Sequence, residues 1–493
     1  MTLSIDTWFA KASLILGLVA PAALAAQTAQ SFNRTAWEAD YRALKIELER
    51  NHAHLAWFGS PQGGVDLPSL DRATQDALTR SQTDAEAANA IRRFIAGFHD
   101  GHLAPAALPA SQPTTPEPPT VERAGDARTA CAAFGYAPVT RVVFSLPFES
   151  LAGFTLVADG FVDAFRAGII THAGLRIGVV RIPRFRAVEF PAVCERVWES
   201  LRARGDEPTR GQISALAGEE WMRILAERIR DLKARGASAL LVDIGGNGGG
   251  NDLGDWAVRL FSRDAVRSAP LLMPASPAAI PYYDEQLQDL RSALASSTGL
   301  SNAGRTELND AIAEFEARKR EAASPSCDMS WVWRERRPWG TSACTRLIPS
   351  GFASGARAYV DSGSFPPSAA HALYWASSAD AFRGAWNGAT YVLTDANTGS
   401  AAEMFAALIR DRGIAKIVGR HTFGLGCGFL AGGAPFVLPS LRLAFSIPNC
   451  VRLRADGTDE VAGIAPDIPM EAAPGESPRG VASRVLQAIA TAR

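Results

Sequence analysis

The chain has 493 residues, more than a single hydrophobic core usually organises, and this length predicts two or three packed units. Apolar residues make up 47% of the sequence and charged residues 20%, as in an ordinary globular protein. The formal net charge of −1 provides no field that would attract polyanions, so we expect no nucleic-acid partner.

Residues 1–25 have the pattern of a signal peptide. Lys11 precedes an apolar run over residues 12–24, which ends in the small-residue triplet ALA. Pro21 interrupts this run, which is also shorter than the ~20 residues that span a bilayer core, and both features argue against a membrane anchor. The sequence therefore predicts a periplasmic or secreted protein without stable membrane insertion.

The predicted organisation after residue 25 begins with a helical domain over residues 31–105, where apolar residues recur with helical spacing. Residues 106–175 start with the Pro-rich segment PASQPTTPEPPTVE, which is typical of a linker, and continue as an irregular β region. We find no PDZ-like signature between residues 103 and 174. Residues 471–493 are expected to form a C-terminal helix or tail.

Residues 176–470 alternate apolar strands with amphipathic helices, which predicts an α/β core built on a largely parallel sheet. The main predicted strands are residues 237–244 and 390–395, and the main predicted helices are residues 213–234, 253–261 and 400–412. Residues 265–355 break this rhythm with a helical hairpin and a Trp-rich stretch. We interpret them as an insertion near the substrate cleft.

The six cysteines are even in number and include no C-x-x-C pair, which favours disulfides over a zinc site or a thioredoxin-like centre. Buried free thiols are the alternative. We expect at least two disulfides. Nearest-neighbour closure is the simplest pairing and would join Cys131 to Cys194, Cys327 to Cys344, and Cys427 to Cys450.

The segment YVLTDANTGSAAEMF places Ser400 where a buried strand turns into a helix. Such a turn raises a hydroxyl above the carboxyl edge of a sheet, beside the free N–H groups of the helix. The pair Ser400 and Glu403 is equally typical of a capping box, which many helices have without catalysis. The motif alone leaves the catalytic and the structural interpretations open.

The segment DIGGNGGG, residues 243–250, follows another buried strand, and its glycines could form an anion-binding nest or an ordinary turn. It is not a phosphate-binding P-loop, because it has no lysine followed by Ser or Thr. Taken with other segments, it resembles the tail-specific (C-terminal processing) peptidase superfamily. DIGGNGGG, GSAAE at residues 399–403 and GIAPDI at residues 463–468 are similar, in order, to that family's D-L-R-x-N-x-G-G, S-A-x-E and G-x-x-P-D-I signatures.

Two further segments, VVRIPRF at residues 179–185 and DGHL at residues 100–103, also resemble the family pattern. The resemblance covers roughly residues 85–105 and 175–470, without the insertion. It implies a crotonase- or ClpP-like spiral α/β core with an N-terminal helical cap, and a serine-type peptidase that acts on peptides or proteins. It implies no metal or organic cofactor.

The chain departs from the Ser-Lys branch of the family, which carries its lysine twenty-five residues after the nucleophile, because Leu425 stands at that position. It resembles instead the Ser-His-Glu branch, which includes the tricorn core and chlamydial protease-like activity factor and has its glutamate about sixty residues downstream. Glu460 fits this spacing. The second departure is Gly245, where the family usually has arginine.

The predicted catalytic residues are therefore Ser400 as nucleophile, His102 as base and Glu460 as the orienting carboxylate. The expected oxyanion-hole donors are the N–H of Ala401 and one from Gly249 or Gly250. His421, in GRHTFG, is the main alternative base, followed by His99. Two other functions remain open: a catalytically inactive binding protein on the same fold, and a serine hydrolase of non-peptide esters or amides.

Overall fold

The structure is a computed structural model. It describes residues 32–108, 126–138, 142–161, 164–324, 327–340, 346–430, 435–440 and 442–492. The predicted signal peptide and the whole Pro-rich segment PASQPTTPEPPTVE lie outside these residues. Among the helices of the described ranges, none is long and apolar enough to cross a membrane.

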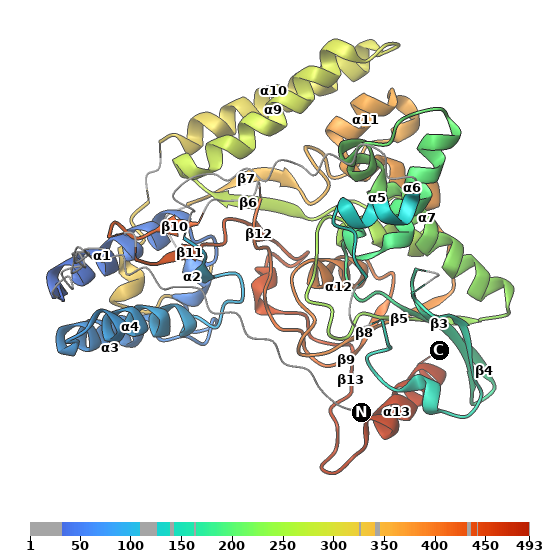
Figure 1. Cartoon of the computed structure of the whole chain (residues 1–493), viewed down its shortest axis with the longest axis horizontal. Coiled ribbons are helices and arrows are strands. Elements are labelled where there is room, and N and C mark those ends of the chain that lie inside the picture. The colour runs from blue at the N-terminus through green and yellow to red at the C-terminus, as the bar shows by residue number, and fades with distance from the viewer. Residues whose placement is uncertain are drawn as a thin grey trace, which may run out of the picture.

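Four helices form the N-terminal part, which lies to the left in Figure 1. Each of the three longer helices begins at a side-chain cap, because Asn33, Asp66 and Thr83 accept a hydrogen bond from the N–H three residues further on. The core of this part includes Trp37 and Phe94. The helices are α1 (Arg34–Asn51), α2 (Leu55–Phe58), α3 (Leu67–Arg80) and α4 (Asp84–Ala96).

A seven-stranded sheet forms the centre of the larger part, with the strand order β13-β9-β8-β5-β4-β3-β2. The five strands from β13 to β4 run parallel, as expected for the α/β core, whereas β3 and β2 extend the sheet antiparallel. The strands are β2 (Phe154–Ala158), β3 (Ala167–His172), β4 (Leu175–Arg181), β5 (Ala239–Asp243), β8 (Ala389–Thr394), β9 (Lys416–Gly419) and β13 (Ile468–Pro469).

Side chains of the central strands alternate between two buried faces, as the pleat requires. Val242 and Val392 pack in one core cluster with α7 (Arg210–Ala234) and α12 (Ala401–Asp411). Their neighbours Leu241 and Leu393 pack on the other face, against α13 (Pro478–Thr491). With helices on both faces, the strands are buried on both sides, which explains their nearly continuous apolar sequences. The mixed α/β fold class is confirmed.

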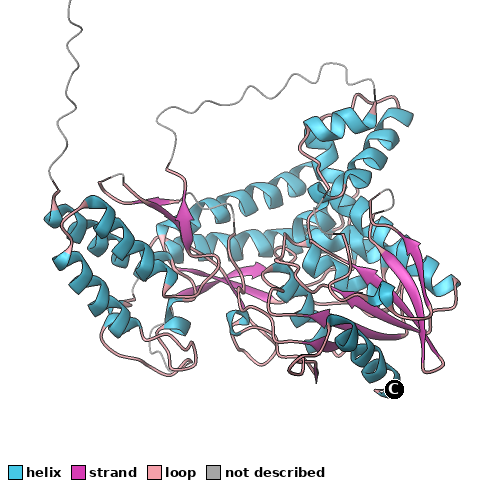
Figure 2. Ribbon diagram, turned by 60° about the horizontal axis from the view of Figure 1, so that its bottom comes forward, coloured by secondary structure: helices cyan, strands magenta, loops and turns pink. Residues whose placement is uncertain are grey.

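Two small sheets are present besides the central sheet. In Figure 2 the N-terminal helices form a group at the left, and the strands of the central sheet lie at the right. Segments far apart in the sequence pair in both sheets. One sheet contains β1 (Ala104–Ala106), β11 (Ala444–Ser446) and β10 (Phe436–Val437). The other contains β12 (Val451–Arg452), β6 (Pro270–Pro274) and β7 (Leu347–Phe352).

The predicted insertion contains a long helical hairpin, α9 (Ile280–Ser296) and α10 (Asn302–Ala322), at the top of Figure 1. Its Trp-rich stretch leaves the hairpin and packs Trp331 and Trp333 into the core of the N-terminal helices. The remaining α-helices of the described ranges are α5 (Ala127–Ala133), α6 (Pro191–Ala203), α8 (Leu253–Trp256) and α11 (Pro367–Leu373).

Two of the expected disulfides are present. Cys131–Cys194 joins α5 to α6, with 5.8 Å between the Cα atoms. Cys427–Cys450 joins the loop after β9 to the residue before β12, with 5.4 Å between the Cα atoms. The expectation of at least two disulfides is therefore confirmed. The third pairing includes Cys344, which lies outside the described residues, and it stays a prediction.

Candidate active site

Ser400 lies between the end of β8 and the first residue of α12, as the sequence predicted. Its backbone has φ 56° and ψ −121°, a conformation that a residue with a side chain rarely adopts. A serine in a sharp strand-to-helix turn with such strained dihedrals is typical of a nucleophile that must project from the edge of a sheet. The position at the start of α12 also brings the serine close to the free N–H groups of the helix.

The turn that carries Ser400 is fixed to the glycine-rich loop after β5. Gly399 donates its N–H to the carbonyl of Asn247 at 3.0 Å, and Thr398 donates its hydroxyl to the carbonyl of Ile244 at 3.2 Å. The side chain of Asn247 is in turn held by the carbonyl of Ile182, at 2.9 Å. The two loops predicted from separate motifs therefore form one unit at the carboxyl edge of the sheet.

Gly249 lies directly against Ser400. A Cβ atom at this glycine would lie 2.6 Å from the Cβ of Ser400 and 2.8 Å from the nitrogen of Ala401, and its φ is +106°. Only glycine fits this conformation and this approach. The Gly249 N–H is donated to Asn247 Oδ1 at 2.9 Å. By contrast, no hydrogen bond within the described ranges uses the N–H of Ala401 or Gly250.

The buried carboxylate of Glu403 organises the loop beside Ser400. It accepts the N–H of Ser400 at 2.9 Å and the hydroxyl of Thr422 at 2.6 Å. It also accepts three consecutive N–H groups, from Gly424, Leu425 and Gly426. Burial raises the pKa of Glu403, while the hydrogen bond from Thr422 lowers it. The capping-box glutamate therefore also fixes a distant loop.

His102 lies in the short segment between α4 and β1. The side chain of Asp100 accepts the backbone N–H of His102 at 2.8 Å and that of Leu103 at 3.3 Å, which shapes the turn. Immediately after this turn, β1 pairs with β11 of the larger part. The strand pairing attaches the segment that carries His102 to the larger part of the molecule, which contains Ser400.

The imidazole of His102 has a defined tautomer. Its Nδ1 lies 3.1 Å from the carbonyl oxygen of Leu425, and because a carbonyl only accepts, Nδ1 carries the proton. The ring lies beside Gly428 and at 5.7 Å from the ring of Phe429, centroid to centroid. Burial lowers the pKa of His102, so that the neutral ring, with Nε2 as an acceptor, dominates at neutral pH.

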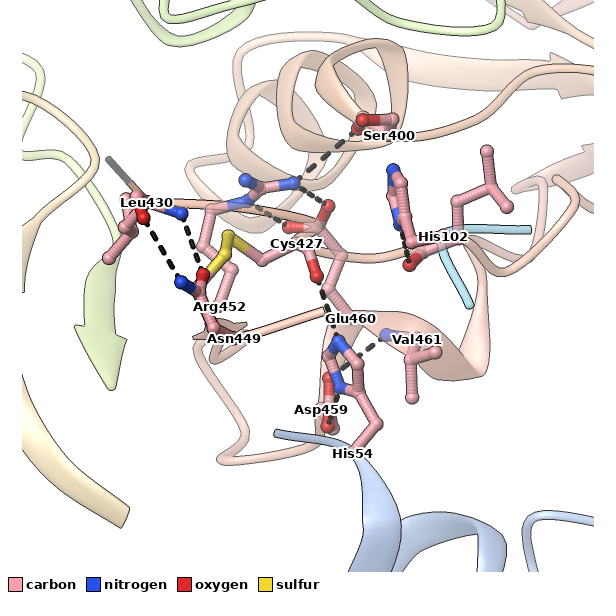
Figure 3. The surroundings of a disulfide bond; sticks show 12 residues. His54, His102, Ser400, Cys427, Leu430, Asn449, Arg452, Asp459, Glu460 and Val461 are labelled. Atoms are coloured by element: carbon pink, nitrogen blue, oxygen red, sulfur yellow. Dashed lines mark hydrogen bonds and ion pairs between the residues drawn. A yellow bond between two sulfur atoms is a disulfide. The ribbon is translucent and has the colours of Figure 1, made fainter. Parts of the chain in front are cut away.

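Leu425 lies between the turns that carry Ser400 and His102. A Cβ atom at Gly399 would lie 2.5 Å from Leu425 Cδ1, and one at Gly101 would overlap Leu425 Cδ2. The two glycines directly precede the two predicted catalytic residues, so the turns that carry these residues both contact one leucine side chain. Figure 3 shows His102 and Ser400 on the same side of the Cys427–Cys450 disulfide.

Glu460 is buried close to this group, but it contacts a cation. Arg452 donates Nε to one of its carboxylate oxygens at 2.8 Å and Nη2 to the other at 2.5 Å. The same Nη2 lies 3.4 Å from the carbonyl oxygen of Ser400 (Figure 3). Within the described ranges, the His102 ring forms its hydrogen bond with the Leu425 carbonyl and not with Glu460. The orienting role expected for Glu460 therefore stays a prediction.

The alternative base His421 is exposed, and its Nδ1 contacts the carbonyl of Thr422 at 2.8 Å. Its ring packs against Gly463. His99 has a positive φ of 55° and forms part of the turn before Asp100. No group of three or more His, Cys, Asp or Glu side chains in the described ranges is arranged to hold a metal ion.

Residues 334–470, which include Ser400 and Glu460, match the sequence model of peptidase family S41. This part of the chain has the sequence pattern of an S41 peptidase. The match begins inside the segment that we interpreted as an insertion, so the end of that segment, including β7, belongs to the family pattern. The enzyme is a serine-type peptidase of the tail-specific superfamily, as the motifs indicated.

The fold of the peptidase is similar to that of solved structures. It matches mature CPAF at 15% sequence identity with a TM-score of 0.54, covering 92% of this chain and 96% of that chain. It matches mature CPAF complexed with lactacystin at 14% identity with a TM-score of 0.53, covering 92% of this chain and 98% of that chain. A search of curated protein sequences gives no match.

Two features of the peptidase's site were missed in the sequence. The first is Arg452, which pairs with Glu460, and the second is the carbonyl and side chain of Leu425. Leu425 stood out only as the residue in place of the family lysine. An arginine eight residues before the predicted glutamate was visible, but nothing local indicated that the two side chains meet in a buried pair.

Proposed function

We propose that this chain is an exported peptidase that hydrolyses peptide bonds of peptides or proteins through an acyl-enzyme on Ser400, with His102 as the base. The observation that carries the proposal is the state of His102: its Nδ1 is committed to the Leu425 carbonyl, which leaves Nε2 free to accept a proton. A base in that tautomer beside a serine in a strained strand-to-helix turn is the arrangement that nucleophilic catalysis needs.

In the proposed reaction, His102 Nε2 takes the proton of Ser400 as the Oγ attacks the carbonyl carbon of the scissile bond. The negative charge that develops on the carbonyl oxygen is stabilised by backbone N–H groups. Ala401 and Gly250 are the best candidates, because their N–H groups have no partner within the described part of the chain. Gly249, whose N–H is donated to Asn247, shapes the hole by its close approach to Ser400.

Collapse of the tetrahedral intermediate breaks the C–N bond, and the leaving amine takes the proton back from His102. A water molecule then gives its proton to His102 and attacks the acyl carbon; the acyl C–O bond breaks, and Ser400 Oγ takes the proton back from His102. We propose that Glu460 supports these steps in this conformation through Arg452, which holds the carbonyl of the nucleophile. No step needs a metal ion or an organic cofactor.

The test is labelling with a fluorophosphonate probe, which forms a covalent bond only with an activated serine. We expect the probe to modify Ser400, and the Ser400→Ala variant to lose both labelling and hydrolysis of a labelled protein such as casein. The melting temperature should stay within a few degrees, because a lost helix cap costs about 1 kcal/mol. A Ser400→Ala variant that still hydrolyses casein would remove this residue from the mechanism, and labelling without casein hydrolysis would favour a non-peptide substrate.

We also propose that the protein is exported. The support is the signal-peptide pattern of residues 1–25 together with two disulfides, which persist in oxidising compartments. N-terminal sequencing of the secreted or periplasmic protein should begin near Ala26 or Gln27. A mature chain that still begins at Met1 or Thr2 and sediments with membranes would contradict export by signal cleavage.

A further inference from the structure

Leu425 contacts the site through three different groups. Its carbonyl accepts the Nδ1 proton of His102 at 3.1 Å. Its N–H donates at 2.9 Å to Glu403 Oε2, the atom that also accepts the N–H of Ser400. Its side chain lies against the backbones of the two glycines that precede Ser400 and His102. One residue is therefore connected to both the nucleophile and the base.

The two glycines are explained by this leucine. Neither Gly101 nor Gly399 has its φ in the left-handed region, so neither position needs glycine for its backbone conformation. A Cβ atom at either position would instead meet a methyl group of Leu425. Glycine at these positions lets the turn before His102 and the turn before Ser400 approach the same side chain from two sides.

We propose that Leu425 is a positioning residue that sets the separation and orientation of Ser400 and His102. Its side chain does so by packing against the backbone at Gly101 and at Gly399. The inference rests on the proposed function, because it takes these two residues as nucleophile and base. Leu425 stands where the Ser-Lys branch of the family would carry its lysine, but an apolar side chain transfers no proton. It acts by filling the space between the two turns.

The backbone hydrogen bonds of Leu425 alone do not fix this separation. They hold the loop to Glu403 and hold the ring nitrogen to the loop, and both persist when the side chain is shortened. The side chain is the part that excludes other arrangements, since it is in van der Waals contact with both turns. Shortening it should therefore loosen the geometry of the site while leaving the loop in place.

The experiment measures fluorophosphonate labelling of the full chain as a saturation curve, which gives a maximal rate constant and a half-saturating concentration. We expect Leu425→Ala to lower the maximal rate constant by roughly 10- to 100-fold, as small misplacements of reacting groups do. The half-saturating concentration should change by less than about twofold, because the probe still enters the same site. Leu425→Met, which nearly conserves volume, should keep most of the rate.

Leu486→Ala is the matched control. Leu486 is fully buried in α13, on the face of the sheet that packs against this helix, so the same truncation lowers stability without touching the site. Its maximal labelling rate should equal that of the wild type. If Leu486→Ala and Leu425→Ala slow labelling equally, or if Leu425→Ala labels at the wild-type rate, the positioning role is wrong.

A double-mutant cycle tests the contact itself. Gly399→Ala should slow labelling because the new methyl displaces Leu425, and the shortened side chain of Leu425→Ala should leave room for that methyl. The double variant should therefore be no slower than the slower single variant. Independent losses that multiply would show that the glycine and the leucine act separately, and would overturn the inference.

The pKa of His102, measured without substrate, tests the positioning role of Leu425 independently of the proposed function. Burial lowers the pKa of His102, and water admitted by Leu425→Ala should raise it toward the ordinary value, which an NMR titration of the ring protons measures in the absence of any substrate. An unchanged His102 titration contradicts the positioning role. If Ser400→Ala retained hydrolysis while the titration shifted as expected, the proposed function would fail and the packing would stand.

Discussion

In the proposed mechanism, the chemistry at Ser400 depends on the protonation state of the His102 imidazole. His102 must be neutral to accept a proton, and its pKa is lowered by burial, the largest influence on it. A nearby carboxylate, Asp100, opposes this shift. Because the folded pKa lies below the ordinary value of ~6.5, the active form persists to mildly acidic pH.

We predict that the acylation rate falls on acidification with a midpoint below ~6.5. His102→Ala should lower kcat by at least ~10²-fold, because a general base contributes that much or more. Rates of casein hydrolysis and of fluorophosphonate labelling between about pH 4 and 8 measure both effects. A lysine base would require activity to appear only at higher pH or in a much drier pocket.

Two substitutions serve as controls for this prediction. Lys416 is exposed and donates to the carbonyl of Ala492, so Lys416→Met should be nearly silent. His421→Ala should also retain activity, since its ring lies exposed at Gly463. Loss of activity in His421→Ala with retention in His102→Ala would reassign the base, even with Ser400 as nucleophile.

The sequence motifs were sufficient to predict that Ser400 and His102 belong to one site, because each lies in a short segment that resembles the family pattern. The partner of Glu460 was not predictable in this way. Its carboxylate faces Arg452 because β12 pairs with β6 and turns the guanidinium inward, a consequence of strand pairing across about 180 residues. The sequence around a carboxylate does not determine which cationic side chain pairs with it in the folded core.

At the scale of elements, the start of α12 and the loop of residues 422–428 are one cooperative unit. Both meet at the carboxylate of Glu403, whose five accepted hydrogen bonds come from the helix, from Thr422 and from the loop backbone. A buried acceptor surrounded only by donors is costly to replace, since each unsatisfied N–H costs about 1 to 3 kcal/mol.

We predict that Glu403→Gln lowers the stability of the fold by about 2 to 4 kcal/mol and also abolishes labelling of Ser400. Both carboxylate oxygens of Glu403 accept hydrogen bonds, and in glutamine one of them is replaced by an NH₂ group, which only donates. In either orientation of the amide, this group therefore faces donors and leaves them without an acceptor. Urea unfolding followed by circular dichroism measures the stability. Glu227→Gln, on the surface of α7, is the matched control and should change stability by less than ~0.5 kcal/mol.

The predicted core helices at residues 213–234 and 400–412 lie within a few residues of α7 and α12, because their apolar positions recur with a period of 3.6, whereas α6 was not predicted. The predicted helix at residues 213–234 is α7 (Arg210–Ala234), which begins at a capping box formed by Thr209 and Gln212. The irregular β region was harder to place. Its strands β2 and β3 extend the central sheet antiparallel, and only the pairing of β3 with β4 shows that they belong to it.

At the scale of the whole molecule, a buried histidine joins the helical part to the core. His54 precedes α2, its Nδ1 lies 2.7 Å from Asp459 Oδ2, and its Nε2 lies 2.8 Å from the carbonyl of Cys427. Both partners are acceptors, so the ring carries two protons and a positive charge. Burial opposes this charge, but Asp459 and the Cys427 carbonyl raise the pKa of His54 to about 9.

This raised pKa predicts a loss of stability at alkaline pH. The folded value of about 9 lies above the unfolded value of ~6.5, so the stabilisation is complete below ~6.5 and is lost as the pH rises through 9. The contribution is on the order of 3 kcal/mol at most. His52, whose pKa burial lowers, acts in the opposite direction and destabilises the fold at acidic pH.

Urea unfolding at pH 6, 7.5 and 9.5 measures the predicted decline for the wild-type protein. His54→Asn should be less stable at pH 6 and should show a flatter dependence between pH 7 and 9.5. His371→Asn, an exposed histidine in α11, is the control and should behave like the wild type. Equal slopes for the wild type and His54→Asn would contradict a charged His54.

The pairing of β1 with β11 has a consequence for the timing of activity. The histidine and the serine are separated by most of the chain, and Leu425, Arg452 and Glu460 all follow the serine. Strand β11, the pairing partner of β1, follows Ser400 in the chain and is therefore synthesised after it. A growing chain therefore cannot pair β1 with β11 until residues 444–446 have been made, and a chain that ends before residue 425 lacks Leu425, Arg452 and Glu460.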